Sequence, residues 1–537
     1  MPEHTIINSH HNDIPDPEGF TLSYWRFALA ALSGVLMALP MIDPAFFLFS
    51  WFGFLPLFLS LKNVPLKQCY FLSLCAGLAL YFCSSYWILP FIMNMKAYGL
   101  VLSFVISLIY WAYSAHVIIF IFMLWVFLSR DIVWERLVLF PMLSIMLFSL
   151  FPSVFPVQLG VGQSQNLLAL QATDLVGIYG LDFMIALSNI CLYELLNLKR
   201  SKGPLLPWAV CGLLFCLWFI YGYNSLTDWE QQQQNWTTKK IALVQPNDMP
   251  SIAIPEPKNG FSWSYPREMK MTEQLVKNGA EIVFWPESRY KGYFDSAYVR
   301  AAYLNRIKAL GAPLVFQDLE YINNQANGLQ GGDTYNSMVM LSGEGELEAV
   351  YHKQKRIPFS EYVPLIASNE SIQAWVQAII GDFLVTISKG EDRPVFFAAG
   401  MHIIPLICYE VLFPEFVAKS VSQSPSGSVL LAASFDAWFG QTNAPFLHLA
   451  LSKIRAVENR LPLVHVINNG PSAVMMPSGQ VVAQTEAFTE TAVIIDMPYS
   501  KALSTSFYSQ HPLFFRYLVY VLLLLLVMRR VKQYIFH

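Results

Sequence analysis

Eight apolar stretches constrain what this chain can fold into more than any other feature of its sequence. A helix needs about 20 mostly apolar residues to cross a bilayer. Stretches of that kind lie at 24–42, 44–62, 68–92, 98–128, 134–151, 173–197, 205–224 and 512–528, the fourth long enough to require a tilted or extended helix. Only 13% of the residues are charged, against about 25% in soluble domains. The sequence therefore predicts a multi-pass helical membrane protein.

Basic residues mark alternate loops between these stretches, and such loops are expected in the cytoplasm. They are Lys62, Lys67, Arg130, Arg136, Lys199, Arg200, Lys202, Arg529, Arg530 and Lys532. The predicted layout is a cytoplasmic tail at 1–23, seven transmembrane helices at 24–224, an extracytoplasmic domain at 225–511, a last span at 512–528 and a cytoplasmic tail at 529–537. The acidic first residues lack a basic n-region and a cleavage site, which argues against a cleaved signal peptide.

Residues 225–511 alternate short apolar runs with helical patterns. Runs at 240–244, 281–285, 313–316, 402–407, 429–431 and 463–467 are typical of buried strands, and 266–278, 297–310 and 446–460 are typical of helices. This alternation predicts an α/β domain with helices covering sheets. The glutamine tract at 231–234 is expected to be a linker. With 34 basic and 37 acidic residues, the chain lacks the basic excess of a nucleic-acid-binding protein.

Cys408 is the only cysteine in residues 225–511, whereas the other six lie inside apolar stretches. It directly follows the strand-like run 402–407 and precedes Tyr409 and Glu410. A single cysteine excludes an internal disulfide in this domain, and no cysteine–histidine cluster has the spacing of a zinc site. No metal or other cofactor is predicted. Cys408 is thus either a nucleophile or a small core residue.

Two other segments of the domain place reactive groups near predicted strand ends. Glu287 lies in the segment Trp-Pro-Glu-Ser at 285–288, and Lys353 in Tyr-His-Lys at 351–353. A thiol must lose its proton to attack, a carboxylate can accept that proton, and a lysine can stabilise both the thiolate and a developing oxyanion. Glu287, Lys353 and Cys408 therefore form a complete set for acyl transfer through a thioester. Taken singly, Glu287 also fits a solvated turn and Lys353 a solvated basic stretch.

The ordered motifs resemble the nitrilase superfamily, and the membrane layout resembles its branch of bacterial apolipoprotein N-acyltransferases. Further matching segments lie at 244–247, 335–337, 436–440, 455–458 and 468–470. The resemblance implies an α-β-β-α sandwich in which Glu287 is the general base, Lys353 stabilises the oxyanion with a backbone N–H near Tyr409, and Cys408 is the nucleophile. By the same resemblance, Glu361 and Glu410 are expected to orient Lys353 and an incoming amine. Trp375, Ile379 and Trp438 are expected to line the substrate site.

The reaction that the resemblance implies moves an acyl chain from a phospholipid, typically phosphatidylethanolamine, to the cysteine and then to the amine of a diacylglyceryl apolipoprotein. It takes place on the outer face of the bacterial inner membrane, in agreement with the predicted topology. The sequence departs from the family pattern at Pro246, Lys355, Ser360, Phe435, Leu461 and His465. A relative with another amine acceptor, a membrane-tethered amidase and a non-enzymatic scaffold of an export apparatus are the alternatives.

Apolar residues recur at helical spacing just before the nucleophile segment. They are Ile372, Trp375, Val376, Ile379, Ile380, Phe383, Leu384 and Ile387. Such a stripe is typical of an amphipathic helix. It fits either a helix that faces a core or an interfacial arm that leads acyl chains toward Cys408, and the family resemblance favours the arm.

Overall fold

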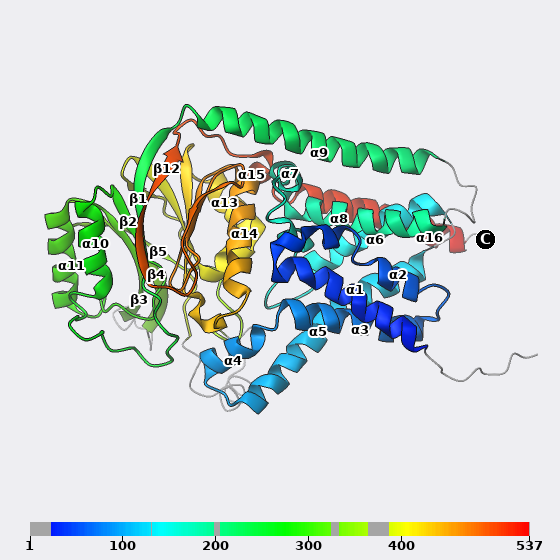
Figure 1. Ribbon diagram of the computed structural model, residues 1–537, viewed down its shortest axis with the longest axis horizontal. Helices are drawn as coiled ribbons and strands as arrows, with labels where there is room; N and C mark the ends of the chain where they lie inside the picture. Colours follow the sequence, from blue (N-terminus) through cyan, green and yellow to red (C-terminus); the bar gives the residue numbers. More distant parts are fainter. Residues whose placement is uncertain (1–22, 130–131, 198–204, 324–331, 363–385, 536–537) are drawn as a thin grey trace, which may run out of the picture.

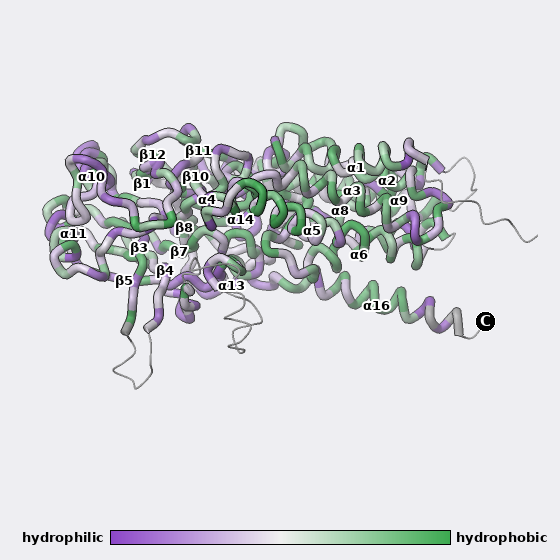
Figure 2. The backbone as a smooth tube through the Cα atoms, turned by 90° about the horizontal axis from the view of Figure 1, so that it is seen from below, coloured by the Kyte–Doolittle hydropathy of each residue, from purple (hydrophilic) through white to green (hydrophobic). Residues whose placement is uncertain are grey.

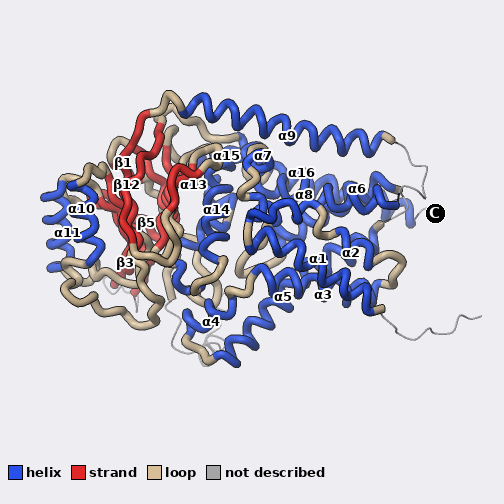
Figure 3. Tube along the Cα trace, in the orientation of Figure 1, coloured by secondary structure: helices blue, strands red, loops and turns tan. Residues whose placement is uncertain are grey.

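The computed structural model describes residues 23–129, 132–197, 205–323, 332–362 and 386–535. A helical bundle and an α/β domain follow one another along the long axis of the molecule (Figures 1 and 3). Hydrophobic residues dominate the helical half, and hydrophilic residues gather in the α/β half (Figure 2). The predicted fold class, a membrane bundle joined to an α/β domain, is confirmed.

Six helices of the described chain are long and apolar enough to cross a membrane. They are α1 (Tyr24–Ile42), α3 (Leu66–Ser84), α5 (Leu100–Leu128), α6 (Val133–Leu150), α8 (Thr173–Asn197) and α9 (Leu206–Gln233). The C-terminal helix α16 (Phe514–Ile535) packs against α6 and α8. Helix α9 lies along the edge of the bundle (Figure 1) and leaves most of its apolar side chains exposed, which suits contact with lipid tails.

Three of the predicted apolar stretches differ from single spans of the predicted length. The stretch 44–62 consists of a 3-10 helix, η1 (Pro44–Trp51), and a short helix, α2 (Leu55–Ser60), which both pack against α1. They separate at Phe52, whose φ of −143° is not helical. The stretch 68–92 is divided into α3 and α4 (Ile88–Lys96). Helix α9 continues to Gln233, within the glutamine tract expected to be a linker, because glutamine is a good helix former. The division into seven spans stays a prediction.

The α/β half contains two six-stranded sheets. The first has the order β12-β1-β2-β3-β4-β5 and the second β11-β10-β9-β8-β7-β6. The strands are β1 (Thr237–Gln245), β2 (Ile282–Phe284), β3 (Leu314–Asn323), β4 (Gly332–Leu341), β5 (Leu347–His352), β6 (Phe396–Ala398), β7 (Met401–Ile407), β8 (Ser428–Ser434), β9 (Leu463–Ile467), β10 (Ala473–Met475), β11 (Val481–Gln484) and β12 (Thr491–Tyr499). Neighbouring strands pair in parallel within β1-β2-β3 and within β7-β8-β9, and every other pair of neighbours is antiparallel.

Helices cover the outer face of each sheet, which gives the implied α-β-β-α order. Helices α10 (Arg267–Lys277) and α11 (Ala297–Leu310) cover the first sheet, while α13 (Pro414–Ser422) and α14 (Ala444–Asn459) lie between the second sheet and the bundle (Figure 1). All seven residues of β8 are buried, as expected of a central parallel strand covered on both faces. The carboxyl ends of parallel strands meet at one edge of a sheet, so the loops after β7 and β8 are brought together in the second sheet. The loop after β2, in the first sheet, meets them where the Phe435 N–H donates to Glu287.

Candidate active site

Glu287, Lys353 and Cys408 lie together near the ends of three strands. Glu287 comes shortly after β2, Lys353 directly after β5 and Cys408 directly after β7. Lys353 Nζ is 2.8 Å from Glu361 Oε1 and 3.8 Å from Glu287 Oε1. All four residues line one polar pocket. The fold thus assembles the three groups that the sequence analysis combined.

Glu287 is held by two uncharged donors in addition to the lysine. Asn336 Nδ2 donates to Oε1 at 2.7 Å, and the Phe435 N–H donates to Oε2 at 3.0 Å. Gln317 fixes the amide of Asn336 through a hydrogen bond of 2.8 Å. Burial raises the pKa of Glu287, although Lys353 and Asn336 act in the opposite direction. A carboxylate with a raised pKa is a better general base than an exposed one.

Cys408 stands at a sharp turn between β7 and the 3-10 helix η5 (Cys408–Leu412). Its φ of +49° is in the left-handed region, which residues with a side chain seldom adopt. Burial and the charge of Glu287 raise the pKa of the thiol well above its usual value, while Lys353 acts to lower it. The thiol is therefore protonated in the resting site, and a base has to remove the proton during attack.

Lys353 is a buried cation whose charge depends on its two carboxylate neighbours. Its side chain is only 1% exposed. Burial lowers the pKa of Lys353, but Glu361 and Glu287 outweigh that effect and raise it above the ordinary range. Glu361 is itself fixed by the Ile357 N–H, which donates to Oε2 at 2.8 Å. A fixed cation beside the thiol has the properties needed to stabilise an oxyanion.

Glu410 was expected, with Glu361, to orient Lys353 and an incoming amine, and the structure gives it contacts on the side of Lys353. Its Oε1 accepts hydrogen bonds from the Tyr351 hydroxyl at 2.7 Å and from the N–H groups of Gln354 and Lys355 at 2.6 and 3.1 Å. Its Oε2 accepts from the Ile407 N–H at 2.8 Å. The side chain is fully buried, so Glu410 has no surface to offer a substrate. It instead ties the segment carrying Lys353 to the segment carrying Cys408.

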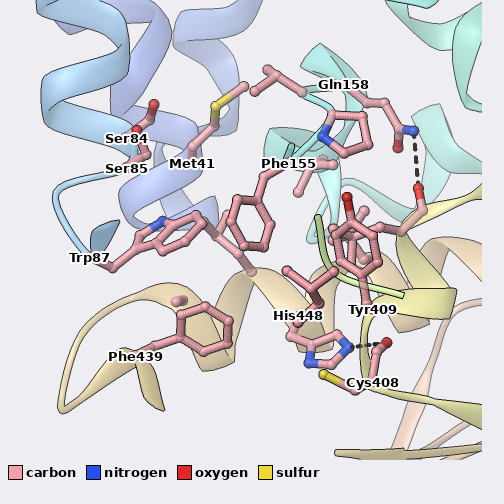
Figure 4. Close-up of a pocket in the computed structure, with 18 of the residues that line it drawn as sticks. Met41, Ser84, Ser85, Trp87, Phe155, Gln158, Cys408, Tyr409, Phe439 and His448 are labelled. Carbon is pink, nitrogen blue, oxygen red and sulfur yellow. Dashed lines mark hydrogen bonds between the residues drawn. The ribbon is translucent and has the colours of Figure 1, made fainter. Parts of the chain in front are cut away.

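A second, apolar pocket reaches Cys408 from the side of the bundle (Figure 4). It contains about 820 Å³ of empty space, part of it open to solvent. Its lining includes Met41, Ser84, Ser85, Trp87, Tyr110, Phe155, Ile357, Cys408, Tyr409, Phe439 and His448. The ring of Trp87 meets those of Phe155 and Phe439 edge-on, with centroids 5.0 and 5.2 Å apart. Cys408 is therefore shared by a polar pocket and an apolar pocket.

Tyr409 and Trp438 have different places in these two pockets. The Tyr409 hydroxyl donates to the Val154 carbonyl, and its ring packs edge-on against Phe155 at 5.7 Å, within the apolar pocket. Trp438 lines the polar pocket, and its carbonyl accepts a hydrogen bond of 3.0 Å from Asn94 in α4. The predicted lining residues Trp375 and Ile379 lie outside the described residues. Of the stripe at 371–387, Ile387 is described and lines the polar pocket.

His448 was missed by the sequence analysis. Its Nδ1 lies 2.9 Å from Asp436 Oδ2, and its Nε2 lies 3.3 Å from the Cys408 carbonyl oxygen (Figure 4). Burial lowers the pKa of His448, but Asp436 and the carbonyl outweigh this effect and raise it. When His448 is protonated, both ring nitrogens can donate, one to the Asp436 carboxylate and the other to the Cys408 carbonyl. Asp436 lies in one of the matching segments, but His448 lies 40 residues after Cys408 among apolar helix residues, so no spacing linked the two.

Asn336 and the Phe435 N–H were not predicted as partners of Glu287 either. Asn336 lies in the matching segment 335–337, which is the one signal that marked it. Phe435 acts through its backbone, which explains why this departure from the family pattern leaves the base in place. Among the described residues, no group of three or more His, Cys, Asp or Glu side chains has the arrangement of a metal site.

Two family models match the chain. Residues 33–191 match the apolipoprotein N-acyltransferase N-terminal domain, and residues 240–505 match the carbon-nitrogen hydrolase family. The apolipoprotein N-acyltransferase of Geobacter metallireducens is 28% identical over 505 residues, which cover 87% of this chain and 88% of that protein. Its counterpart in Azotobacter vinelandii is 28% identical over 482 residues, with 86% and 87% covered. The match to the Rickettsia prowazekii enzyme, also at 28% identity, covers 60% of this chain and 62% of the relative.

A solved amidase from Nesterenkonia AN1, of the nitrilase superfamily, aligns with 49% of this chain and 92% of its own length. The sequence identity is 18% and the TM-score is 0.34.

Proposed function

Because this chain belongs to the apolipoprotein N-acyltransferases, we propose that it transfers a fatty acyl chain from a membrane phospholipid to the N-terminal amine of diacylglyceryl-cysteine apolipoproteins. The observation that carries this proposal is the position of Cys408. It lies between a polar pocket with a buried Glu–Lys pair and an apolar pocket lined by residues of the bundle. An acyl ester needs both environments, one for its chain and one for its reacting polar end.

In the first half-reaction, Glu287 accepts the thiol proton as Cys408 Sγ attacks the ester carbonyl carbon of the phospholipid. The C–S bond forms and the carbonyl electron pair moves to oxygen, where Lys353 and the N–H near Tyr409 stabilise the negative charge. The ester C–O bond then breaks, and Glu287 returns the proton to the oxygen of the departing lysophospholipid. The product on the enzyme is a thioester.

In the second half-reaction, the lipoprotein amine attacks the thioester carbon. Glu287 accepts a proton from the amine, Lys353 again stabilises the oxyanion, and the C–S bond breaks as the amide forms. The thiol of Cys408 is restored with a proton from Glu287. Glu361 holds Lys353 in place throughout, because it accepts a hydrogen bond from the Lys353 ammonium group.

We take phosphatidylethanolamine as the donor and the bacterial inner membrane as the location, with the α/β domain on the periplasmic side. The family resemblance supports the donor. The alternation of basic loops supports the orientation, since Lys62 contacts Asn197 and Arg136 contacts Glu194 at the end of α8, and α16 ends on the side of the bundle away from the α/β domain (Figure 1). The bundle residues that line the apolar pocket are consistent with entry of a phospholipid from the surrounding membrane.

The proposal is tested by acylating the purified protein with labelled phosphatidylethanolamine and no acceptor. Label is expected on Cys408 and should be released by neutral hydroxylamine, whereas Cys408→Ala should take up none. A matched control is Cys216→Ser, because Cys216 is an exposed cysteine of α9 away from the site, and it should be labelled like the wild type. Transfer to a diacylglyceryl lipopeptide by Cys408→Ser would exclude the mechanism.

The match to carbon-nitrogen hydrolases favours hydrolysis of the thioester as the second candidate function. The two functions differ in the lifetime of the acyl-enzyme. A transferase keeps the label until an amine is added, whereas a hydrolase loses it to water at the same rate with or without amine. Rescue of a strain that lacks lipoprotein N-acylation, by the wild type but not by Cys408→Ala, would identify the lipoprotein as acceptor.

A further inference from the structure

Arg289 is a cation of the polar pocket that the proposed mechanism does not use. It lies two residues after Glu287, in the loop that follows β2, and lines the pocket together with Lys353 and Cys408. Its Nη2 donates to the Ile252 carbonyl at 2.9 Å. Its Nε is buried and has no hydrogen-bond partner. Within the described ranges, Arg289 takes part in none of the ion pairs of the α/β domain.

The two carboxylates of the pocket are already engaged by other groups. Glu287 accepts from Asn336 and the Phe435 N–H and faces Lys353, and Glu361 accepts from Lys353 and the Ile357 N–H. Burial lowers the pKa of Arg289, but a guanidinium group stays charged at any ordinary pH. A partly desolvated guanidinium without a counter-ion favours binding of an anion from outside the protein.

We propose that Arg289 binds the phosphate of the donor phospholipid while its ester carbonyl lies at Cys408. This inference rests on the proposed function. The ester and the phosphate are attached to one glycerol unit, so a lipid with its chain in the apolar pocket places its phosphate on the polar side of Cys408. The planar guanidinium matches a phosphate with two parallel hydrogen bonds. Ser360 lines the same pocket and supplies a hydroxyl donor.

Lys353 is the other cation of this pocket, but it is a poorer phosphate ligand. It is buried to 1% exposure and is paired with two carboxylates. A phosphate that reached it would have to displace the partners on which its charge depends. Arg289 therefore distinguishes a phospholipid from a neutral glyceride in the first half-reaction. The diacylglyceryl-cysteine acceptor has no phosphate, so Arg289 has no such ligand in the second half-reaction.

The test compares two donors with identical acyl chains in the same detergent micelles, phosphatidylethanolamine and diacylglycerol. The measured quantity is the rate at which acyl label appears on Cys408. The wild type is expected to react faster with the phospholipid. Arg289→Gln should slow acylation by the phospholipid by about ten- to a hundredfold, the effect of losing a charged hydrogen-bonded contact, and leave acylation by diacylglycerol unchanged. Acylation of Arg289→Lys by the phospholipid should proceed at a rate between those of the wild type and Arg289→Gln, because lysine keeps the charge but lacks the planar guanidinium group.

Arg300→Gln is the matched control, because Arg300 is an exposed arginine of α11 in the same domain and outside the pocket. It should behave like the wild type with both donors. Aminolysis of preformed acyl-enzyme by a lipopeptide should proceed at the wild-type rate in Arg289→Gln. Equal slowing with both donors would show that Arg289 only anchors the loop at Ile252, and would overturn the proposal. A wild type that does not discriminate between the donors would overturn it too.

Inorganic phosphate separates a lipid phosphate from a free one. A phosphate tethered to the donor is bound at high effective concentration, so millimolar inorganic phosphate should leave acylation by the phospholipid unchanged. Inhibition that is present in the wild type and absent in Arg289→Gln would assign the site to free phosphate and overturn the lipid assignment. Absence of any acylation of wild-type Cys408 would contradict the proposed function itself, and the lipid-phosphate site with it.

Discussion

Cys408 does not owe its proposed reactivity to a resting thiolate. Burial and the charge of Glu287 raise the pKa of the thiol well above its usual value, so proton removal and attack on the ester have to occur together. In the proposed mechanism the residue that sets the pH dependence is then the base, Glu287, whose pKa is also raised by burial. The donors around Glu287 become as important to the rate as the nucleophile.

Acylation of Cys408 is expected to show one acidic limb in its pH profile, because Glu287 acts as a base only when ionised. The midpoint should lie above 4.5, the ordinary pKa of a glutamate, since burial raises the pKa of Glu287. Asn336→Ala removes a hydrogen bond that lowers this pKa, so its midpoint should move to higher pH. The measurement is the single-turnover acylation rate against pH. A midpoint unchanged by Asn336→Ala would show that another group controls the limb.

His448 is expected to stabilise the turn at Cys408 in a pH-dependent way. Its pKa is raised in the folded protein, so its stabilising effect is complete below the unfolded value and is lost as the pH rises through the folded value. His448→Gln should lower the free energy of unfolding by about 1–3 kcal/mol at mildly acidic pH and by less at alkaline pH. Thermal unfolding of the wild type and the variant in detergent, at several pH values, measures this difference in stability. A difference that does not change with pH would contradict a stabilising contact of protonated His448 with Asp436 and the Cys408 carbonyl.

Helix α14 connects the candidate site to the bundle. His448 in its first half contacts Asp436 and the Cys408 carbonyl, and Glu458 in its last turn accepts a hydrogen bond of 2.7 Å from the Ile178 N–H of α8. Arg460, directly after the helix, contacts Asp174, Gln171 and Ser225 through hydrogen bonds of 2.8–2.9 Å. Helix α14 and the residue that follows it therefore contact both the turn at Cys408 and two helices of the bundle, α8 and α9.

Arg460→Ala is expected to weaken the junction of the two halves. It removes a buried guanidinium whose hydrogen bonds span α8, α9 and the loop at Pro477, and it leaves Asp174 with only the Tyr221 hydroxyl. The expected loss of stability is about 3 kcal/mol or more. Thermal unfolding in detergent and limited proteolysis at the junction measure it, with Arg300→Ala as the control. Arg460→Lys should recover part of the loss, and unfolding of Arg460→Ala at the wild-type temperature would contradict this role.

Local patterns were sufficient to predict most elements. The strands at 240–244 and 463–467 and the helices at 297–310 and 446–460 correspond to β1, β9, α11 and α14, because each is a continuous run with one periodicity. The break within 44–62 was not predicted, since an apolar window does not record the non-helical φ at Phe52. The same limit applies to the site. Glu287, Lys353 and Cys408 are each marked by a strand end, whereas His448 is linked to Cys408 only by the packing of α14.

The molecule as a whole places its apolar and polar halves end to end (Figure 2), with the candidate site between them. Lys62, Arg136 and Arg530 contact Asn197, Glu194 and Glu135, and they lie at the end of the bundle where α16 finishes (Figure 1). If the membrane surrounds the bundle, these basic residues lie at one of its faces and the α/β domain at the other. The apolar pocket then lies where the bundle meets the α/β domain, because residues of both halves line it.

This orientation predicts which introduced cysteines react with a membrane-impermeant maleimide. Lys277→Cys, at the exposed end of α10, should be labelled once the outer membrane is opened. Arg529→Cys, exposed near the end of α16, should be labelled only after the inner membrane is also disrupted. Both are made in a Cys216→Ser background, because Cys216 is itself exposed. The reverse pattern of labelling would place the α/β domain in the cytoplasm.

The two substrates of the proposed reaction share one polar pocket, and this restricts the order in which they can bind. In the proposed reaction the departing lysophospholipid headgroup and the arriving lipoprotein amine both use the space around Arg289 and Lys353, because Cys408 lines this polar pocket as well as the apolar one. The two substrates must therefore occupy the enzyme in turn. Excess lipoprotein should inhibit by binding to free enzyme before any acyl group is loaded, and added phospholipid should relieve that inhibition. Turnover in a cell would then depend on the ratio of donor phospholipid to acceptor lipoprotein and not on the abundance of either one alone.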